Sequence, residues 1–410
     1  MAAGLQETPG AERLHIGIFG RTNSGKSSFL NALTGQEISI VADVAGTTTD
    51  PVAKAMELSP LGACTLIDTA GFGDKTALGR QRLDKTRLAA EKTELAVIVV
   101  AGDLKPQADG TFELKDELEW YRFFAERKTP VLFVINKADC VEDTAPLLAQ
   151  IKKETKEEAL LVSAKTNDGM AAVREALARK IPEDYGSRQI TGTLAGEQDV
   201  VLLVMPQDIQ APKGRLILPQ VQTLRELLDK KCIAISVTTE GLTAALAALH
   251  EPPKLIITDS QVFAEVYDKK PKETMLTSFS VLFAAYKGDL PYYVEGAKQL
   301  DSLCGDARVL IAECCTHAPL AEDIGRIKLP RMLRARYGET LSVDIVSGTD
   351  FPKDLSGYDL IIQCGACMFN RKYVMARIDR AREQRVPMTN YGVAIAHLTG
   401  IMDKLAIQAE

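Results

Sequence analysis

Short apolar runs alternate with stretches of helical periodicity along most of the chain. Polar or glycine-containing loops follow several of these runs, and the same alternation returns after residue 196. Strands that alternate with helices favour parallel sheets covered by helices, so we expect an α/β fold throughout. The runs that we interpret as strands are His15–Gly20, Val131–Ile135, Ala159–Val162, Val200–Met205, Ile233–Val237, Lys254–Ile257, Arg308–Ala312, Tyr358–Ile362 and Val386–Met388.

Two breaks in this pattern divide the chain. Helical periodicity in Asp168–Lys180 ends at a proline, and Pro182–Gly196 has the composition of a linker. A second break, charged and containing proline, lies at Lys269–Lys272. A length of 410 residues also suggests several domains. We therefore expect three domains, over residues 1–184, 185–270 and 271–410.

Composition narrows the class of protein further. An apolar fraction of 46% with 25% charged residues is typical of globular proteins. The net charge of −6 disfavours a general nucleic-acid binder, which needs a basic face. No apolar run approaches the roughly 18 residues of a membrane helix, and Met1–Arg13 does not resemble a signal peptide. We expect a cytoplasmic protein that binds neither membrane nor nucleic acid.

The loop after the first predicted strand carries a phosphate-binding motif. Gly20–Ser27 matches G-x-x-x-x-G-K-[ST], and a helical pattern, Ser28–Leu33, follows it. In such a loop the backbone wraps the phosphates, Lys26 reaches the β- and γ-phosphates, and Ser27 ligates Mg²⁺. The loop residues expected to bind nucleotide are Asn23, Ser24, Gly25, Lys26, Ser27 and Ser28.

Three further motifs follow in order. Asp68-Thr69-Ala70-Gly71 ends a strand, so Asp68 can hold Mg²⁺ through water and the Gly71 N–H can contact the γ-phosphate. The Asp139 carboxylate can accept hydrogen bonds from guanine N1–H and its exocyclic amine, which selects GTP over ATP. The residues predicted to form the base pocket are Asn136, Lys137, Asp139, Ser163, Ala164 and Lys165. These motifs resemble those of the translation-factor-related GTPases.

The switch segment indicates how hydrolysis proceeds. Ala45–Asp50 resembles the switch of the Era and tRNA-modification GTPases, with Thr49 in place of their arginine. By that resemblance Thr47 and Thr48 are the switch threonines, and Thr48 contacts Mg²⁺. Phe72 stands where Ras-like proteins carry a water-orienting glutamine, and Asn23 resembles the asparagine that binds K⁺ in cation-activated relatives. We expect slow hydrolysis of GTP to GDP and phosphate, stimulated by K⁺, with Lys26, Thr48, Asp68 and Gly71 as its catalytic residues.

Five of the eight cysteines lie between residues 304 and 367, where two groups follow predicted strands. Cys315-x-His317 and Cys364-x-x-Cys367 together offer three thiolates and one imidazole to a metal. Both a Cys₃His zinc site and a 4Fe–4S cluster on three cysteines are compatible with this set. Cys314 is expected to face the core, and Cys304 has no partner at ligand spacing. The remaining cysteines, Cys64, Cys140 and Cys232, are interpreted as small buried hydrophobes.

The whole chain resembles the FeFe-hydrogenase maturation GTPases. The resemblance includes Leu276–Ser280, Tyr286–Leu290 and the cysteine motifs, with Gln363 in place of the histidine usual before C-x-x-C. It implies an N-terminal P-loop GTPase domain, a middle dimerisation domain and a C-terminal iron–sulfur domain. The implied ligands of a 4Fe–4S cluster are Cys315, Cys364 and Cys367. A fourth ligand can be His317, a carboxylate such as Glu313, or a non-protein group.

The resemblance also implies a scaffold or carrier role. Such a protein accepts a diiron unit with CO and cyanide ligands from two radical S-adenosylmethionine enzymes, and delivers it to apo FeFe-hydrogenase. A homodimer or a higher oligomer is expected. The alternative is a tRNA-modification or ribosome-assembly GTPase with a structural zinc. That alternative predicts a basic RNA-binding module, and the sequence contains no long Lys/Arg block.

Overall fold

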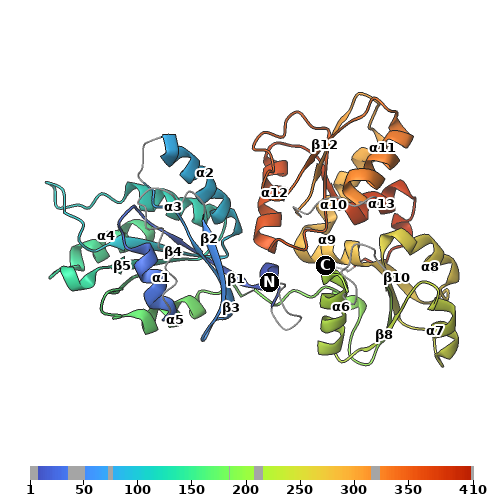
Figure 1. The fold of residues 1–410 in the computed structure, drawn as a ribbon, viewed down its shortest axis with the longest axis horizontal. Helices are drawn as coiled ribbons and strands as arrows, with labels where there is room; N and C mark the ends of the chain where they lie inside the picture. Colours follow the sequence, from blue (N-terminus) through green and yellow to red (C-terminus); the bar gives the residue numbers. More distant parts are fainter. Residues whose placement is uncertain are drawn as a thin grey trace. The chain divides into compact units, whose positions relative to one another are not determined.

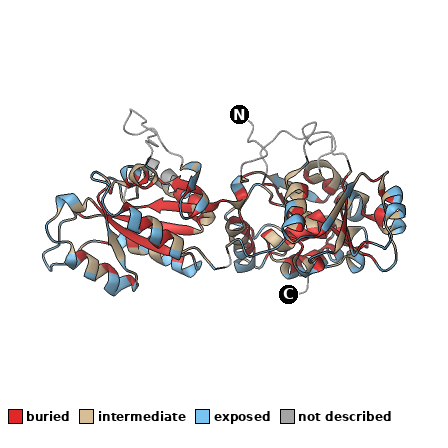
Figure 2. Cartoon of the chain, turned by 90° about the horizontal axis from the view of Figure 1, so that it is seen from below, coloured by how far each residue is buried: buried red, intermediate tan, exposed pale blue. Residues whose placement is uncertain are grey.

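The chain folds into two compact units, residues 1–185 and 186–410 (Figure 1). The computed structural model describes residues 8–35, 51–72, 77–183, 185–206, 216–314 and 324–407, without the side chains of 77–82. Each unit consists of mainly parallel sheets covered by helices. Figure 2 shows that buried residues follow the strands of these sheets. The described helices include none that is both long and apolar enough to cross a bilayer.

A six-stranded sheet forms the centre of the first unit. Its order is β2-β3-β1-β4-β5-β6, and every pair is parallel except β2 with β3. All six residues of β5 are buried, as expected for a central parallel strand that is covered on both faces. The strands are β1 (Leu14–Phe19), β2 (Val52–Leu58), β3 (Gly62–Asp68), β4 (Leu95–Ala101), β5 (Val131–Asn136) and β6 (Ala159–Leu161).

Helices cover both faces of this sheet. α1 (Lys26–Thr34) and α5 (Met170–Arg179) pack on one face, where Phe29 and Leu177 are fully buried. Two more helices pack on the other face, where Trp120 stacks on Phe19 with ring centroids 5.3 Å apart. These are α3 (Lys115–Glu126) and α4 (Ala145–Thr155), and the remaining elements are α2 (Ala77–Lys92) and the short helices η1 (Gly10–Glu12) and η2 (Ala138–Cys140).

The second unit contains two four-stranded parallel sheets with the same topology. One has the order β8-β7-β9-β10 and the other β12-β11-β13-β14. In both, the chain places its first strand inside, its second strand to one side, and its third and fourth strands to the other. The strands are β7 (Val200–Val204), β8 (Ile233–Val237), β9 (Leu255–Thr258), β10 (Met275–Ser278), β11 (Arg308–Ala312), β12 (Ser342–Val346), β13 (Leu360–Gln363) and β14 (Met388–Asn390).

The repeated order creates a topological switch point in each sheet. Connections leave the first strand in opposite directions, and in open α/β sheets ligands bind beyond the carboxyl ends of the strands at such a point. In the C-terminal sheet the first and third strands are β11 and β13, which pair in parallel from Val309↔Leu360 to Ala312↔Gln363. The two predicted cysteine groups follow these strands. The topology therefore directs Cys314 and Cys364 to one edge of the sheet.

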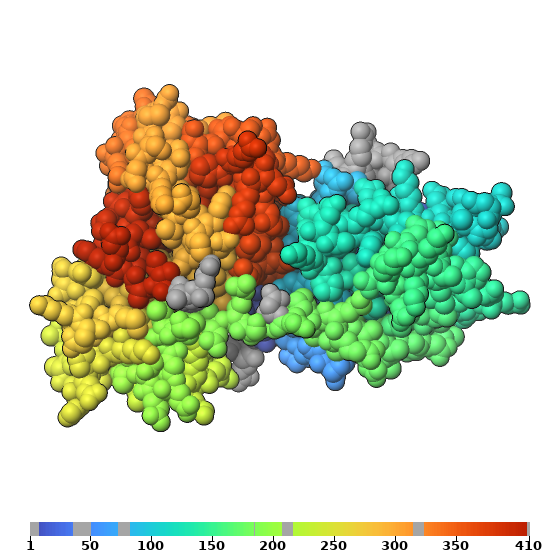
Figure 3. Space-filling view, turned by 180° about the vertical axis from the view of Figure 1, so that it is seen from behind, coloured from blue at the N-terminus to red at the C-terminus, as the bar shows by residue number. Residues whose placement is uncertain are grey.

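The two sheets of the second unit pack through their helices. α13 contacts α9 and η4, and Ala396 of α13 shares a core with Phe263 of the middle domain. Figure 3 shows the red C-terminal segment against the yellow segment of the middle domain. The helices are α6 (Leu218–Asp229), α7 (Leu242–Ala248), α8 (Phe263–Lys269), α9 (Phe279–Lys287), α10 (Leu290–Ala297), α11 (Leu329–Tyr337), α12 (Arg371–Glu383), α13 (Tyr391–Leu398), η3 (Gly192–Leu194), η4 (Ser260–Val262), η5 (Lys298–Asp301), the π-helix η6 (Ile324–Lys328) and η7 (Met402–Lys404).

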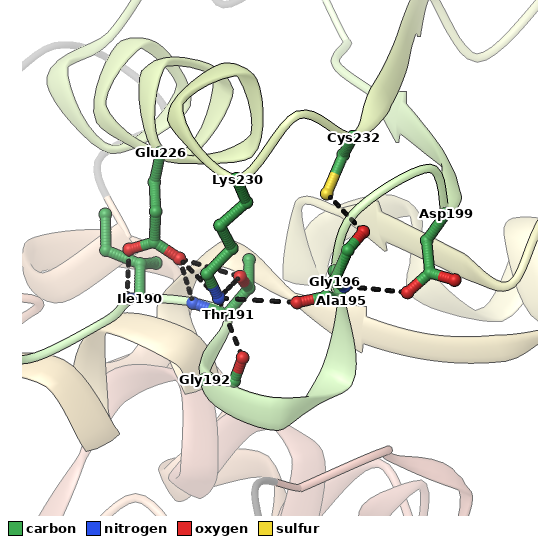
Figure 4. A network of polar contacts seen from close by, with 9 residues as sticks. All are labelled: Ile190, Thr191, Gly192, Ala195, Gly196, Asp199, Glu226, Lys230 and Cys232. Atoms are coloured by element: carbon green, nitrogen blue, oxygen red, sulfur yellow. Dashed lines mark hydrogen bonds and ion pairs between the residues drawn. The ribbon is translucent and has the colours of Figure 1, made fainter.

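The second half of the expected linker belongs to the middle domain. Ile190, Thr191 and Leu194 are buried, and α6 holds this segment in place (Figure 4). The Glu226 carboxylate accepts from the Ile190 and Thr191 amides, while Lys230 Nζ donates to Gly192 O over 2.7 Å. Glu226 and Thr191 lie 35 residues apart in the sequence, so local composition does not reveal their contact.

The middle sheet also extends beyond the expected boundary after residue 270. β10 pairs in parallel with β9, from Met275↔Leu255 to Ser278↔Thr258. A strand was expected over Val386–Met388, but β14 instead covers Met388–Asn390. Its polar residues are fully buried because Thr389 donates to Tyr293 O and Asn390 caps α13. Apolar patterning does not detect such a strand.

The lone cysteines differ in their surroundings. Cys64 and Cys232 are buried, as expected for small hydrophobes. Cys140 is exposed, so the expectation that it is buried was wrong. It lies in η2 beside Asp139, on a loop at the edge of the sheet rather than in a strand.

We predict that Gly296→Ala destabilises the second unit. A Cβ at Gly296 in α10 would lie 2.1 Å from Met388 O, against the backbone of β14. Backbone cannot rotate away, so we expect a loss of about 2 kcal/mol or more in unfolding free energy, measured by denaturant titration. Gly357→Ala is the control, because its Cβ would only touch the end of Arg308 at 3.4 Å. Equal stability of both variants would show that α10 packs less closely than described.

Candidate functional site

The phosphate loop lies between β1 and α1. Gly25 has a left-handed backbone (φ 84°), and a Cβ there would lie 2.4 Å from Asn136 Nδ2. Both facts require glycine. Lys26 is buried, and its ammonium donates to Gly20 O and Arg21 O, each over 3.0 Å. Burial lowers the pKa of Lys26 to about 8. Its charge therefore lies inside the loop, where phosphates approach.

Two predicted magnesium ligands meet beside this loop. Ser27 Oγ donates to Asp68 Oδ2 over 2.9 Å, which joins the start of α1 to the end of β3. The other oxygen, Asp68 Oδ1, is buried and has no hydrogen-bond partner among the described residues. Burial also raises the pKa of Asp68. A hydroxyl and a carboxylate with an unpartnered oxygen fit the hard oxygen ligands that Mg²⁺ prefers.

The segment after β3 pairs with the phosphate loop. Phe72 N donates to Gly20 O, and Thr22 N donates to Phe72 O. A Cβ at Gly71 would lie 2.7 Å from Thr22 N, so glycine permits this close approach. The Phe72 ring is buried against Trp120, with centroids 6.2 Å apart, and cannot orient water. Thr47 and Thr48 lie outside the described residues.

Asn136 joins the phosphate loop to the base pocket. Its Nδ2 donates to Ser24 O over 3.2 Å, and its Oδ1 accepts from Ala164 N over 3.0 Å. Ser163 Oγ donates to Asp139 Oδ1 over 2.7 Å, and this bond lowers the pKa of Asp139. The carboxylate therefore stays ionised and available to a base. These contacts bring together the residues expected to bind phosphate and guanine.

An ion pair that sequence reasoning missed holds the outer side of the loop. Arg21 Nε lies 3.0 Å from Glu117 Oε1 and 3.6 Å from Asp116 Oδ2. The Glu117 residue is 1% exposed. Burial raises the pKa of Glu117, and Arg21 opposes this rise. The partners are almost a hundred residues apart, so no local signal connects them. Asn23 is exposed on the same loop, with left-handed backbone (φ 65°).

The second site lies at the switch point of the C-terminal sheet. Cys364 follows β13 at once, and Cys314 follows β11 after one residue. Cys314 N donates to Cys364 Sγ over 3.1 Å, so the two strand ends are in contact. Cys314 is 4% exposed and faces the core, as predicted. Cys315 and His317 lie outside the described residues.

The C-x-x-C segment forms a tight turn before α12. Ala366 has left-handed backbone (φ 52°), and its amide donates to Cys364 Sγ over 3.4 Å. The Cys314 thiol, followed by the Ala366 amide and the Cys314 amide, lowers the pKa of Cys364 against the effect of burial. Burial raises the pKa of Cys314 well above its usual range. The structure thus favours a thiolate at Cys364.

Gln363, which replaces the usual histidine, and Glu313, a candidate fourth ligand, have other partners. Gln363 is buried, and its Nε2 donates to Cys314 Sγ over 3.2 Å while its Oε1 accepts from Arg377. The Glu313 carboxylate accepts from Arg326 Nε over 2.9 Å. Both groups are therefore engaged within the protein.

The described part of this site is compatible with a metal centre but incomplete. Cys364 and Cys367 are half-buried across the turn, and a Cβ on the intervening Gly365 would meet no atom of the described residues within 4 Å. That open space and the donors around Cys364 fit an anionic centre bound by thiolates. Among the described residues, no three His, Cys, Asp or Glu side chains are gathered closely enough to hold a metal ion.

Family models match three parts of the chain. One described as a 50S ribosome-binding GTPase matches residues 15–137. Those described as the hydrogen maturase F dimerization and tetramerization domains match residues 190–288 and 291–408. Fold and site define a P-loop GTPase domain followed by two α/β domains, which the family models describe as dimerization and tetramerization domains. The chain belongs to the hydrogen maturase F family, the hydrogenase maturation GTPases, which confirms the expected fold class and family.

Individual relatives match mainly the GTPase domain. A GTPase Der of Wolinella succinogenes is 44% identical over 109 residues, which are 26% of this chain and 22% of that protein. The tRNA modification GTPase MnmE of Xanthomonas oryzae pv. oryzae is 35% identical over 158 residues, 38% of this chain and 31% of that protein. The chain spans less than half the length of these relatives.

Solved structures that are similar to part of this chain include the Y63A variant of Aquifex aeolicus Era bound to GDP and aluminium fluoride. It is 18% identical to this chain, with a TM-score of 0.36, and the match covers 55% of this chain and 92% of that one.

We predict that Asp139→Asn weakens GTP binding about tenfold to hundredfold, because an amide cannot accept from both guanine N–H groups. The same amide can donate to xanthine O2, so affinity for xanthosine triphosphate should rise. Titration with fluorescent nucleotide analogues measures both affinities. Asp143→Asn is the control, since that exposed carboxylate only accepts from Ala145 N. Unchanged GTP affinity in Asp139→Asn would show that Asp139 does not bind the guanine base.

Proposed function

We propose that this chain is a GTP-hydrolysing scaffold that binds a 4Fe–4S cluster and delivers a diiron precursor to apo FeFe-hydrogenase. The observation that carries the proposal is the combination of two sites in one hydrogen maturase F chain. One is a set of contacts that joins the phosphate loop to the guanine pocket, and the other is a cysteine turn at a switch point. A structural zinc in an RNA-acting GTPase is the alternative that the experiments below exclude or support.

In the GTPase domain, Lys26 leaves its loop carbonyls to bind the β- and γ-phosphates. Ser27 and Asp68 hold Mg²⁺, with Thr48 as a further ligand, and Asp139 selects guanine. The Gly71 N–H contacts the γ-phosphate. Mg²⁺ held by these residues would supply positive charge against the charge that develops on the phosphates. Phe72 packs in the core and offers no group that orients water, which supports slow turnover.

In the C-terminal domain, Cys315, Cys364 and Cys367 hold the cluster, and His317 is the candidate fourth ligand. A cluster on three cysteines supplies an iron site that is open to exchangeable ligands. The cargo is a diiron unit with CO and cyanide ligands, received from two radical S-adenosylmethionine maturases in the cytoplasm. The family domains support a homodimer or a higher oligomer. β8 is an edge strand with Ile233 54% exposed, which suits contact with a second copy.

We predict that GTP hydrolysis is faster in KCl than in NaCl at equal ionic strength. K⁺ bound at Asn23 would supply positive charge to the transition state, as an arginine finger does in other GTPases. Phosphate release is measured in both salts for the unaltered chain and for Asn23→Ala, which should lose the difference. Equal rates in the two salts for the unaltered chain would exclude cation activation.

We predict that each chain contains about four iron atoms and about four sulfide ions after anaerobic purification and reconstitution. Cys364→Ser should lose most of this iron and the EPR signal of the reduced cluster. Cys304→Ser is the control, since that exposed thiol donates to Asp306 outside the turn. Stoichiometric zinc in a colourless protein that takes up no iron would contradict the scaffold proposal and support the structural-zinc alternative.

A further inference from the structure

The ion pair between Arg21 and Glu117 anchors the phosphate loop to α3. Glu117 is buried in the first turn of this helix, while Arg21 directly follows Gly20 at the start of the loop. Arg21 Nε lies 3.0 Å from Glu117 Oε1 and 3.1 Å from Glu117 Oε2, so both carboxylate oxygens contact the guanidinium. Asp116, which is more exposed, lies beside the pair and adds a second negative charge.

The backbone of Arg21 carries two contacts that shape the loop. Arg21 O accepts from Ser24 N over 3.2 Å, which closes a turn, and from Lys26 Nζ over 3.0 Å. Arg21 also forms a parallel bridge with Phe72, in the segment after β3. An anchored side chain limits the movement of its own backbone. The ion pair therefore restricts the carbonyl on which the turn and the Lys26 ammonium depend.

One face of α3 makes this anchor rigid. Glu117, Trp120 and Phe124 are spaced as residues on the same side of a helix, and all of them are buried. Trp120 stacks on Phe19 and on Phe72, with ring centroids 5.3 Å and 6.2 Å away. Phe124 meets Phe19 edge to face, with centroids 4.8 Å apart. This face therefore contacts the end of β1, the phosphate loop and the segment after β3.

The pair contributes direction more than stability. Burying an ion pair costs hydration, so two apolar residues of similar size are often as stable in its place. A guanidinium and a carboxylate, however, bond in a fixed geometry, which apolar side chains do not impose. The pair lies on the loop that is expected to bind phosphate. Its geometry is therefore suited to setting the shape of that loop.

We propose that Arg21 and Glu117 are positioning residues that set the affinity of the loop for nucleotide phosphates, without setting the rate of hydrolysis. A loop that is ordered before binding loses less conformational freedom when the phosphates arrive. Bound phosphates would order a loop that lacks the anchor, so saturated protein would still hydrolyse GTP at its usual rate. This inference rests on the proposed binding of phosphates by Gly20–Ser27 and is independent of the metal centre.

The double substitution Arg21→Met with Glu117→Met is the sharpest test. It removes the directional contact without leaving a buried charge, so the fold is retained. In titrations of the full chain with fluorescent GTP and GDP analogues, we expect both affinities to fall about tenfold. The turnover number at saturating GTP should stay the same, as for a loss of binding common to ground state and transition state. Glu117→Gln keeps the shape but not the charge, so it should weaken both affinities to a smaller extent.

The matched control is Lys180→Met with Glu157→Met. This ion pair lies in the same unit, with Lys180 Nζ 2.7 Å from Glu157 Oε2, and joins the end of α5 to the segment before β6. Its removal should leave both nucleotide affinities unchanged. Trp120 is the only tryptophan of the chain, so its fluorescence shows for each variant whether α3 is still packed.

Unchanged affinity for both nucleotides in the folded double variant at Arg21 and Glu117 overturns the inference. A fall in turnover number that exceeds the fall in affinity also overturns it, because the pair would then act in the transition state. If this variant does not fold, Glu117→Gln decides: weaker binding supports the inference, and unchanged binding overturns it. If the unaltered chain and the control bind neither GTP nor GDP, the proposed nucleotide site fails instead.

Discussion

Parallel pairing is the constraint on which both sites depend. Parallel strands present their carboxyl ends at one edge of a sheet, so loops far apart in the sequence meet there. In the first unit, β1, β3, β5 and β6 end at such an edge, and the phosphate and guanine loops follow them. In the C-terminal sheet, β11 and β13 bring Cys314 and Cys364 into contact. Site residues are therefore neighbours because their strands are neighbours.

Buried amides connect the loops at both sites. Asn136 is the last residue of β5 and Gln363 the last of β13, and both are buried. Each amide both donates and accepts: Asn136 joins Ser24 to Ala164, and Gln363 joins Cys314 to Arg377. A neutral group that can do both satisfies two elements without burying a charge of its own.

The repeated topology of the second unit separates fold from chemistry. In the middle sheet, Thr258 ends β9 where Gln363 ends β13, and its hydroxyl donates to Val204 O of β7 over 3.1 Å. Asp259 follows it where Cys364 follows β13. The two sheets share a strand order, while only the C-terminal one carries cysteines at this point among its described residues. Function therefore lies in the loop residues and not in the shared frame.

The sequence by itself determined the α/β class, the nucleotide motifs and the cysteine spacing, because these signals are local. Apolar runs predict buried strands, and the spacing of Gly20–Ser27 is set by the backbone path around phosphate. Contacts between distant residues were decided only by the tertiary structure: Glu226 holding Thr191, Glu117 holding Arg21, and Arg377 meeting Gln363. β14, with buried Thr389 and Asn390, was misplaced for the same reason. Its polar side chains are satisfied by partners that no local pattern reveals.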